Sequence, residues 1–229
     1  MINIYEVGGA IRDRLMKIPS KDKDYAVEAG SYQEMKDRIL IGGGTIYLEK
    51  PEFLTIRCKM PGFGDADFVL CRKDGVYYDG RHPNSVEPGT IYDDLKRRDF
   101  TMNAIAFNVQ TNEYIDPHGG VLDIANRVIR CVGNAHDRFT EDALRMLRAL
   151  RFLITKNMTL SYDIVECLYD PSLLEGLTNT STDRVRDELT KCFKADTAQT
   201  LQLFSKFEMF RNYIFDTRKE LWLKPTTEE

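Results

Sequence analysis

The sequence predicts an α+β protein in two parts, with a mixed-sheet domain over residues 1–135 and an all-helical domain over residues 136–229. In the first part, short apolar segments alternate with turn residues, as in domains that mix strands and helices. From Thr140 onward the apolar residues recur with a helical period. The 229 residues are 42% hydrophobic, which is enough to form a buried core.

Five apolar segments of the first part are expected to be strands: residues 4–7, 25–27, 55–58, 68–71 and 105–109. Glycine or proline breaks separate them at residues 42–44, 61–62 and 74–75. Residues 11–16 and 32–38 are expected to form short helices between the strands. This alternation indicates a sheet that carries helices.

The helical part is expected to begin at Thr140 as an N-cap, with Glu141 and Asp142 in the first turn. One apolar stripe follows, formed by Ala143, Leu147, Leu150 and Ile154. Further helices are expected near residues 162–169, 182–193 and 197–210, and residues 224–229 are expected to be a frayed tail.

Composition excludes several classes of function. The net charge of −4 means that any contact with nucleic acid must be local, because proteins that bind nucleic acid broadly are usually basic. The five cysteines and three histidines are scattered, which argues against a disulfide framework and a structural zinc site. No apolar run approaches the roughly 20 residues of a membrane span, and no signal peptide is evident, so we expect a cytoplasmic protein without membrane association.

The motif with the clearest chemistry is the pair Asp22 and Asp24, which follows the glycines Gly8 and Gly9 and Arg12. On a strand, residues i and i+2 point to one face, so both carboxylates could hold a pair of Mg²⁺ ions. Glycines let backbone N–H groups approach phosphate, and an arginine can bind phosphate oxygens bidentately. Such an acidic pair also occurs by chance in surface loops, so alone it does not establish a site.

Asp67 offers a third carboxylate at the start of an apolar strand. If that strand lies beside residues 22–27, Asp67 joins the two aspartates to complete a catalytic set for two metal ions. The alternative is that Asp65 and Asp67 are turn residues that follow Gly62 and Gly64.

Six motifs occur in order along the chain: Gly8-Gly9-Ala10-Ile11-Arg12-Asp13, Lys21-Asp22-Lys23-Asp24, Asp79-Gly80-Arg81, Arg97-Arg98-Asp99-Phe100-Thr101-Met102-Asn103-Ala104, Asp116-Pro117-His118-Gly119-Gly120 and the run from Glu141 to Phe152. Together they resemble the head and neck of the class II CCA-adding tRNA nucleotidyltransferase and bacterial poly(A) polymerase family, over roughly residues 4–190. The resemblance implies a polymerase-beta-like nucleotidyltransferase head and a nucleotide-selecting helical neck.

The resemblance also implies roles for individual residues. Asp22 and Asp24 would be metal ligands, Gly8, Gly9 and Arg12 would contact the triphosphate, and Arg98 and Asp99 would contact the ribose. Residues 78–83 would begin the family's flexible loop, and residues 182–189 would brace the neck.

The segment after Thr140 suggests how bases could be selected without a template. If Asp142 and Arg145 share a helix face, Asp142 can accept from the amino group of cytosine or adenine while Arg145 donates to the ring nitrogen. Uracil and guanine present the reverse order. The alternative is an ordinary ion pair on a solvated helix. Arg148 and Arg151 would serve the triphosphate or the packing of the helix.

We therefore expect a Mg²⁺-dependent enzyme that adds C and A, from CTP and ATP, to the 3′ end of tRNA or another RNA. The alternatives are a relative that adds only CC, only A or poly(A), a non-catalytic nucleotide- or RNA-binding module, and an enzyme that transfers nucleotides to a protein or small molecule. Family members usually continue into body and tail domains that hold the tRNA. This chain is either truncated or a short form that anchors RNA another way, and a homo-oligomer could supply such an anchor.

Overall fold

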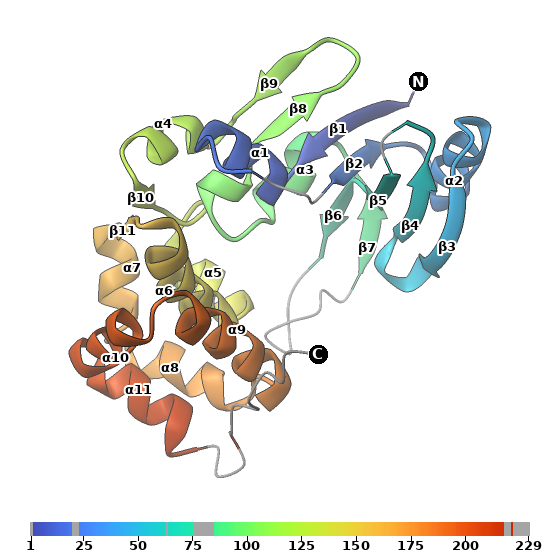
Figure 1. Ribbon diagram of the computed structural model, residues 1–229. Helices are drawn as coiled ribbons and strands as arrows, with labels where there is room; N and C mark the ends of the chain where they lie inside the picture. Colours follow the sequence, from blue (N-terminus) through green and yellow to red (C-terminus); the bar gives the residue numbers. More distant parts are fainter. Residues whose placement is uncertain (1, 20–22, 63, 76–84, 218–220, 222–229) are drawn as a thin grey trace, which may run out of the picture. The chain divides into compact units, whose positions relative to one another are not determined.

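The computed structural model describes residues 2–19, 23–62, 64–75, 85–217 and 221 (Figure 1). By their contacts the described residues divide into two compact units, the first within residues 1–126 and the second within residues 127–229. The first unit contains a mixed seven-stranded sheet and the second is mainly helical. The predicted fold class, a nucleotidyltransferase head with a helical second part, is confirmed.

The sheet of the first unit has the strand order β3-β4-β5-β2-β1-β8-β9. Its strands are β1 (Asn3–Val7), β2 (Asp24–Glu28), β3 (Thr45–Lys50), β4 (Thr55–Met60), β5 (Gly64–Leu70), β8 (Ala106–Asn108) and β9 (Glu113–Ile115). Strands β2 and β5 are parallel, and the other neighbours in the sheet are antiparallel. A separate hairpin consists of β6 (Arg72–Asp74) and β7 (Val86–Pro88).

The helices of the first unit are α1 (Gly9–Leu15), α2 (Tyr32–Ile41), α3 (Ile91–Lys96) and α4 (Gly120–Ala125), with 3-10 turns at Pro51–Phe53 and Thr101–Asn103. Helix α2 covers one face of the sheet, where its buried Met35 and Ile39 join a core with Val27 and Phe68. The next residue after Val27, Glu28, points to the opposite face. There its carboxylate accepts a hydrogen bond of 2.5 Å from the backbone N–H of Ile91 at the start of α3. Helices therefore pack on both faces of the sheet.

The second unit begins with the two-residue strand β10 (Val128–Ile129), which pairs in parallel with β11 (Thr159–Leu160). Its helices are α5 (Ala135–Glu141), α6 (Leu144–Lys156), α7 (Tyr162–Cys167), α8 (Pro171–Thr178), α9 (Thr182–Ala195), α10 (Thr197–Lys206) and α11 (Glu208–Phe215). The amphipathic helices α6 and α9 pack against each other. The predicted apolar stripe of α6 is confirmed, because Leu147, Leu150 and Ile154 are all buried.

The start of the first long helix differs from the prediction. Asn134 caps α5 by accepting a hydrogen bond of 3.1 Å from the backbone N–H of Asp137, so Thr140 lies inside a helix and is not an N-cap. At Asp142 the backbone becomes extended (φ −155°, ψ 100°), and a new helix begins at Leu144. The Asp142 carboxylate accepts a 3.1 Å hydrogen bond from the backbone N–H of Leu144. The run that resembled one helix is therefore two helices with a break at Asp142.

None of the helices in the described part of the chain has the length and apolar character that crossing a membrane requires.

Candidate active site

Two of the predicted catalytic carboxylates lie side by side on the sheet. Asp24 on β2 and Asp67 on β5 are direct partners in the parallel register. The backbone N–H of Asp67 donates a 3.0 Å hydrogen bond to the carbonyl of Lys23, which fixes the two strands at this point. Residues paired in a ladder point to the same face. The structure therefore places Asp67 on a strand beside Asp24, and the alternative of a turn residue is excluded.

An arginine that the sequence analysis did not single out binds the Asp67 carboxylate. Arg57 on β4 donates to both oxygens of Asp67, from Nε at 2.5 Å and from Nη2 at 2.7 Å. The pKa of the Arg57 guanidinium is raised above its ordinary value, chiefly by the hydrogen bond and charge of Asp67 and more weakly by the charge of Asp24. Arg57 thus contributes positive charge next to both aspartates.

Gly8 allows Arg98 and Asp24 to approach the same point of the backbone. A Cβ atom built on Gly8 would lie 3.3 Å from Nη1 of Arg98 and 3.6 Å from Oδ2 of Asp24. The backbone of Gly8 has φ 72° and ψ −138°, a conformation that favours glycine. The next glycine, Gly9, begins α1, and a Cβ atom there would lie 3.4 Å from Nη2 of Arg12. These glycines, both arginines and Asp24 thus lie close together.

The buried carboxylate of Asp94 holds Arg98 in place. Asp94 is 1% exposed and accepts hydrogen bonds from Nη2 of Arg98 at 2.9 Å and from Nη2 of Arg97 at 2.5 Å. Burial alone would raise the pKa of Asp94, but the charges of Arg98 and Arg97 and their hydrogen bonds outweigh burial and hold this pKa below its ordinary value. Nη1 of Arg98 also donates to the carbonyl of Asn103 at 3.1 Å. Arg98 is therefore fixed from two sides.

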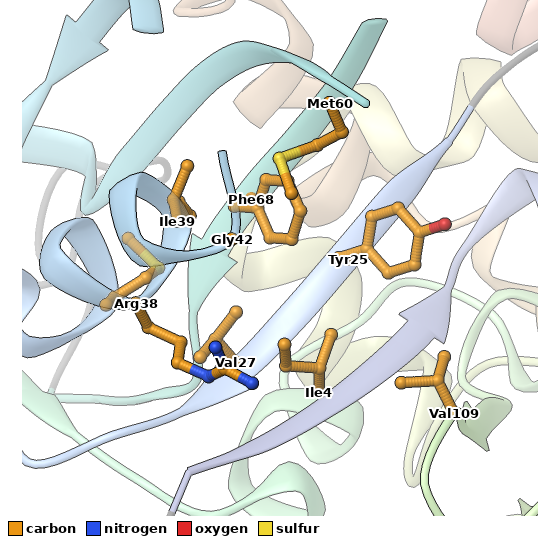
Figure 2. A pocket seen from close by; sticks show the side chains of 10 residues that line it. Ile4, Tyr25, Val27, Arg38, Ile39, Gly42, Met60, Phe68 and Val109 are labelled. Carbon is orange, nitrogen blue, oxygen red and sulfur yellow. The ribbon is translucent and has the colours of Figure 1, made fainter. Parts of the chain in front are cut away.

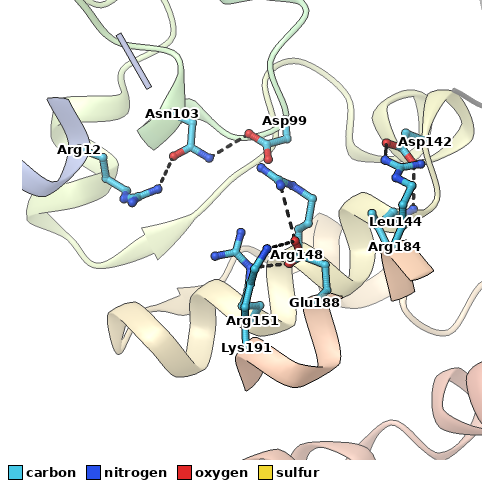
Figure 3. Close-up of polar contacts among 10 residues, drawn as sticks. All are labelled: Arg12, Asp99, Asn103, Asp142, Leu144, Arg148, Arg151, Arg184, Glu188 and Lys191. Atoms are coloured by element: carbon cyan, nitrogen blue, oxygen red, sulfur yellow. Dashed lines mark hydrogen bonds and ion pairs between the residues drawn. The ribbon is translucent and has the colours of Figure 1, made fainter. Parts of the chain in front are cut away.

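A second buried chain of hydrogen bonds joins Arg12 to Asp99 through Asn103 (Figure 3). Nη1 of Arg12 donates to Oδ1 of Asn103 at 2.8 Å, and Nδ2 of Asn103 donates to Oδ1 of Asp99 at 2.9 Å. Nε of Arg12 also donates to the carboxylate of Asp13 at 2.8 Å. Arg12, Asp99 and Asn103 are each less than 10% exposed. The residues predicted to contact triphosphate and ribose thus belong to one preorganised network.

In the second unit, Asp142 pairs with an arginine other than the one predicted. Arg184 on α9 donates to Asp142, from Nη2 to Oδ2 at 2.7 Å and from Nη1 to Oδ1 at 3.4 Å (Figure 3). Arg145 is buried and donates from Nη1 to the carboxylate of Glu141 at 2.7 Å and to the carbonyl of Arg138 at 3.0 Å. The prediction that Asp142 and Arg145 share a helix face is wrong, because Asp142 lies on extended backbone between α5 and α6.

Glu188 on α9 gathers the remaining predicted arginines. Glu188 is buried, with 4% of its surface exposed, and its carboxylate forms an ion pair with Nε of Arg151 (Figure 3). Nη1 of Arg148 lies 3.8 Å from Oε1 of Glu188. Nζ of Lys191 lies 3.4 Å from the same oxygen. The Arg151 guanidinium also lies 3.9 Å from the ring centroid of Phe152. These contacts join α6 to α9 and support the packing role considered for Arg148 and Arg151.

The carboxylates of Asp24 and Asp67 are suitable ligands for Mg²⁺. Carboxylate oxygens are the ligands that Mg²⁺ prefers, and Asp24 and Asp67 lie together on one face. Asp22 and the predicted flexible loop, residues 78–83, lie outside the described residues. Among the residues that are described, no group of three or more Asp, Glu, His or Cys side chains is arranged to hold a metal ion.

An apolar cavity of the first unit lies on the α2 face of the sheet (Figure 2). It has a volume of about 260 Å³, and its walls include the stacked rings of Tyr25 and Phe68, whose centroids are 5.0 Å apart. Its lining includes Arg38 and, among the described residues, no carboxylate. Asp24 precedes Tyr25 and therefore points to the opposite face. This cavity is not part of the candidate active site.

Sequence reasoning missed Arg57, Asp94 and Asn103 in the first unit, and Arg184 as the partner of Asp142 in the second. Asp94 lies among the charged residues 93–99 and Asn103 within the motif 97–104, where nothing in the order of residues shows which carboxylate is buried. Arg57 follows the strand alternation and lies in register with Asp67, so the pairing of β4 with β5 could have revealed it. Arg184 lies 42 residues from Asp142, and only the tertiary structure brings them together.

The chain is similar to known proteins over most of its length. Residues 4–130 match the family described as the poly A polymerase head domain. A CCA-adding enzyme of Streptococcus thermophilus is 40% identical over 167 residues, which cover 72% of this chain and 39% of that protein. A CCA-adding enzyme of Listeria monocytogenes serotype 4b is 35% identical over 242 aligned residues, which cover 98% of this chain and 58% of that protein. The chain thus spans about two fifths to three fifths of the length of these relatives.

Solved structures show the same similarity. The CCA-adding enzyme of Bacillus stearothermophilus in complex with CTP superimposes with a TM-score of 0.75 at 33% identity, covering 90% of this chain and 48% of that chain. A tRNA nucleotidyltransferase complexed with a primer tRNA and an incoming ATP analog superimposes with a TM-score of 0.74 at 28% identity, covering 94% of this chain and 60% of that chain.

Proposed function

Because the chain belongs to the poly A polymerase head-domain family, we propose that it is a template-independent nucleotidyltransferase that adds C and A to the 3′ end of tRNA. CTP and ATP would be the nucleotide donors and pyrophosphate the product. The relatives that cover most of the chain are CCA-adding enzymes, which favours this activity over poly(A) addition. The proposed organisation is a head over residues 1–135 and a neck over residues 136–229.

The observation that carries the proposal is the pairing of Asp24 with Asp67 beside Gly8 and Arg98. Asp22, Asp24 and Asp67 would hold Mg²⁺. When bound, Mg²⁺ would polarise the attacking 3′-hydroxyl and neutralise charge on the departing pyrophosphate. Arg57 would orient the Asp67 carboxylate, because it donates to both of its oxygens.

The remaining residues of the first unit would position the nucleotide. Gly8 and Gly9 would let the backbone approach the triphosphate, with Arg12 beside them. Arg98 and Asp99 would contact the ribose, each held by partners that are already in place without substrate. Such preorganisation favours catalysis because the groups need not be reorganised when the nucleotide binds.

Base selection is proposed to rest on Asp142 in the second unit. Its carboxylate would accept a hydrogen bond from the exocyclic amino group that cytosine and adenine share. The sequence suggests Arg145 as the neighbouring donor, whereas in the structure Arg184 is the guanidinium bonded to Asp142. Replacing each arginine separately by lysine distinguishes these two donors, since only the true donor is needed to discriminate C and A from U and G.

The catalytic proposal is tested with tRNA that lacks its 3′ CCA, labelled CTP or ATP, and Mg²⁺. We expect the wild-type chain to incorporate both nucleotides and Asp24→Asn to lose incorporation by at least about a thousandfold, since it removes a proposed metal ligand. Asp65→Asn is the matched control, because Asp65 is an exposed carboxylate two residues before Asp67 on the same strand. Equal activity of the wild type and Asp24→Asn would refute the proposed site.

A further inference from the structure

An open hollow of about 570 Å³ lies at one end of the sheet in the first unit. It is formed where β3 begins, where β4 turns into β5, and just before β2 begins. The residues used below line this hollow: Lys23, Lys59, Thr45, Gly43, Gly62 and Gly64. We call it the lysine hollow.

The chemistry of the lysine hollow suits a chain of phosphates. Its lining includes two lysines and the hydroxyl of Thr45, and among the described residues no acid belongs to that lining. A Cβ atom on Gly62 or Gly64 would meet nothing within 4 Å, so the space beside each of these glycines is open. Both glycines have positive φ, at 84° and 82°. Lysines provide the electrostatic attraction and glycines let a sugar–phosphate backbone approach closely.

The hollow lies next to the proposed metal site. Lys23 immediately precedes Asp24, and its carbonyl accepts the hydrogen bond from the backbone N–H of Asp67. Lys59 lies in register with Asp65, two residues before Asp67. A polyanion bound in the hollow would therefore lie close to the start of β2, where the two candidate metal ligands are paired.

We propose that the lysine hollow binds the phosphate backbone of the substrate RNA a few nucleotides upstream of its 3′ end. The inference rests on the proposed function, which supplies the RNA. It answers a question raised by the charge of the chain, since a protein of net charge −4 needs a local cationic site to bind RNA. The side chain of Lys59 is exposed, and no described residue forms a hydrogen bond or ion pair with its ammonium group, which is therefore available to phosphate.

The test compares Lys59→Ala with Lys50→Ala. Lys50 is an exposed lysine at the opposite end of the same β3–β4 pair and does not line the hollow. Binding of fluorescently labelled tRNA lacking CCA is measured by anisotropy at several salt concentrations. One lost phosphate contact lowers the slope of log K against log salt by roughly 0.7 to 0.9. The affinity advantage of the wild type over Lys59→Ala should therefore narrow about threefold between about 50 and 200 mM salt.

CTP affinity is measured on the same proteins by titration calorimetry. We expect it to be unchanged in Lys59→Ala, because the hollow is assigned to RNA and not to the triphosphate. The proposal is overturned if Lys59→Ala and Lys50→Ala bind tRNA with the same affinity and salt slope. It is also overturned if CTP affinity falls as much as tRNA affinity, or if an acidic peptide competes as well as RNA of equal charge.

Failure of the proposed function has a different signature. If the wild type adds no nucleotide to any RNA but Lys59→Ala alone weakens RNA binding with the expected slope, the hollow binds RNA and the assigned reaction is wrong. If nucleotides are added and Lys59→Ala leaves RNA binding and its salt slope unchanged, the reaction stands and the hollow is wrong.

Discussion

Substitution of Gly8 by alanine should damage both the stability and the nucleotide site of this protein. The backbone of Gly8 has φ 72° and ψ −138°, and a non-glycine residue in such a conformation costs about 1–3 kcal/mol. The new methyl group would also lie 3.3 Å from Nη1 of Arg98. Arg98 cannot easily withdraw, because Asp94 and the carbonyl of Asn103 hold its guanidinium. We expect Gly8→Ala to lose about 1–3 kcal/mol of unfolding free energy and to bind CTP more weakly.

Gly9→Ala is the matched control for stability. Gly9 is the first residue of α1, its φ is not positive, and its new methyl group would face only the mobile end of Arg12 at 3.4 Å. Alanine is favoured over glycine in helices by up to about 1 kcal/mol, so Gly9→Ala should be within about 1 kcal/mol of the wild type. Urea unfolding followed by circular dichroism measures both variants. Equal stability of Gly8→Ala and Gly9→Ala would refute the argument that Gly8 is required by its backbone conformation.

Three further predictions follow from buried positions. Gly120→Ala should prevent normal packing of α4, because its Cβ atom would lie 2.2 Å from the carbonyl oxygen of Thr101, and a loss of thermal stability much larger than that of Gly8→Ala checks this. Asp94→Asn should cost about 3–5 kcal/mol at neutral pH, as removal of one partner of a buried ion pair does. Folding lowers the pKa of Asp94 below its ordinary value of 3.8. The Asp94 carboxylate therefore contributes fully to the free energy of unfolding above this value, and the contribution is lost as pH falls through the lower folded pKa. Urea unfolding should show that the stability difference between the wild type and Asp94→Asn narrows only below about pH 4. Burial raises the pKa of Cys192 to about 12, so this thiol should react with a disulfide reagent at pH 8 only after unfolding. Labelling of Cys192 in the folded protein, identified by mass spectrometry, would contradict the structure.

Five strands of the first unit, β1, β2, β4, β5 and β8, could be predicted because their apolar residues alternate or cluster between strong turn residues. Strand β3 and the three-residue strands β6, β7 and β9 were missed. Strand β3 lies at the edge of the sheet and most of its residues are exposed, so it carries no apolar pattern. The break between α5 and α6 was also missed. Asp142 lies in a run with good helical periodicity, and only its contacts to Leu144 and Arg184 stabilise an extended residue there.

The candidate site was predictable to the extent that it follows strand geometry. The alternation of side chains on β2 and β5 was enough to suggest Asp67 as a companion of Asp24, and the register of the two strands supports this. The buried hydrogen-bond partners were not predictable in the same way. Arg12 and Asn103 are hydrogen-bonded across 91 residues of sequence, and this contact depends on how the 3-10 turn at Thr101–Asn103 packs on α1.

The sequence of the RNA product tests the proposed function most directly. tRNA lacking its 3′ CCA is incubated with Mg²⁺ and an equal mixture of all four nucleoside triphosphates, and the extended 3′ ends are sequenced for the wild type, Asp142→Ala and Glu166→Ala, an acid on α7 outside the site. We expect the wild type and Glu166→Ala to add C, C and A in order, and Asp142→Ala to add U or G as well. A homopolymer of A, or no extension by the wild type, would contradict the proposed function.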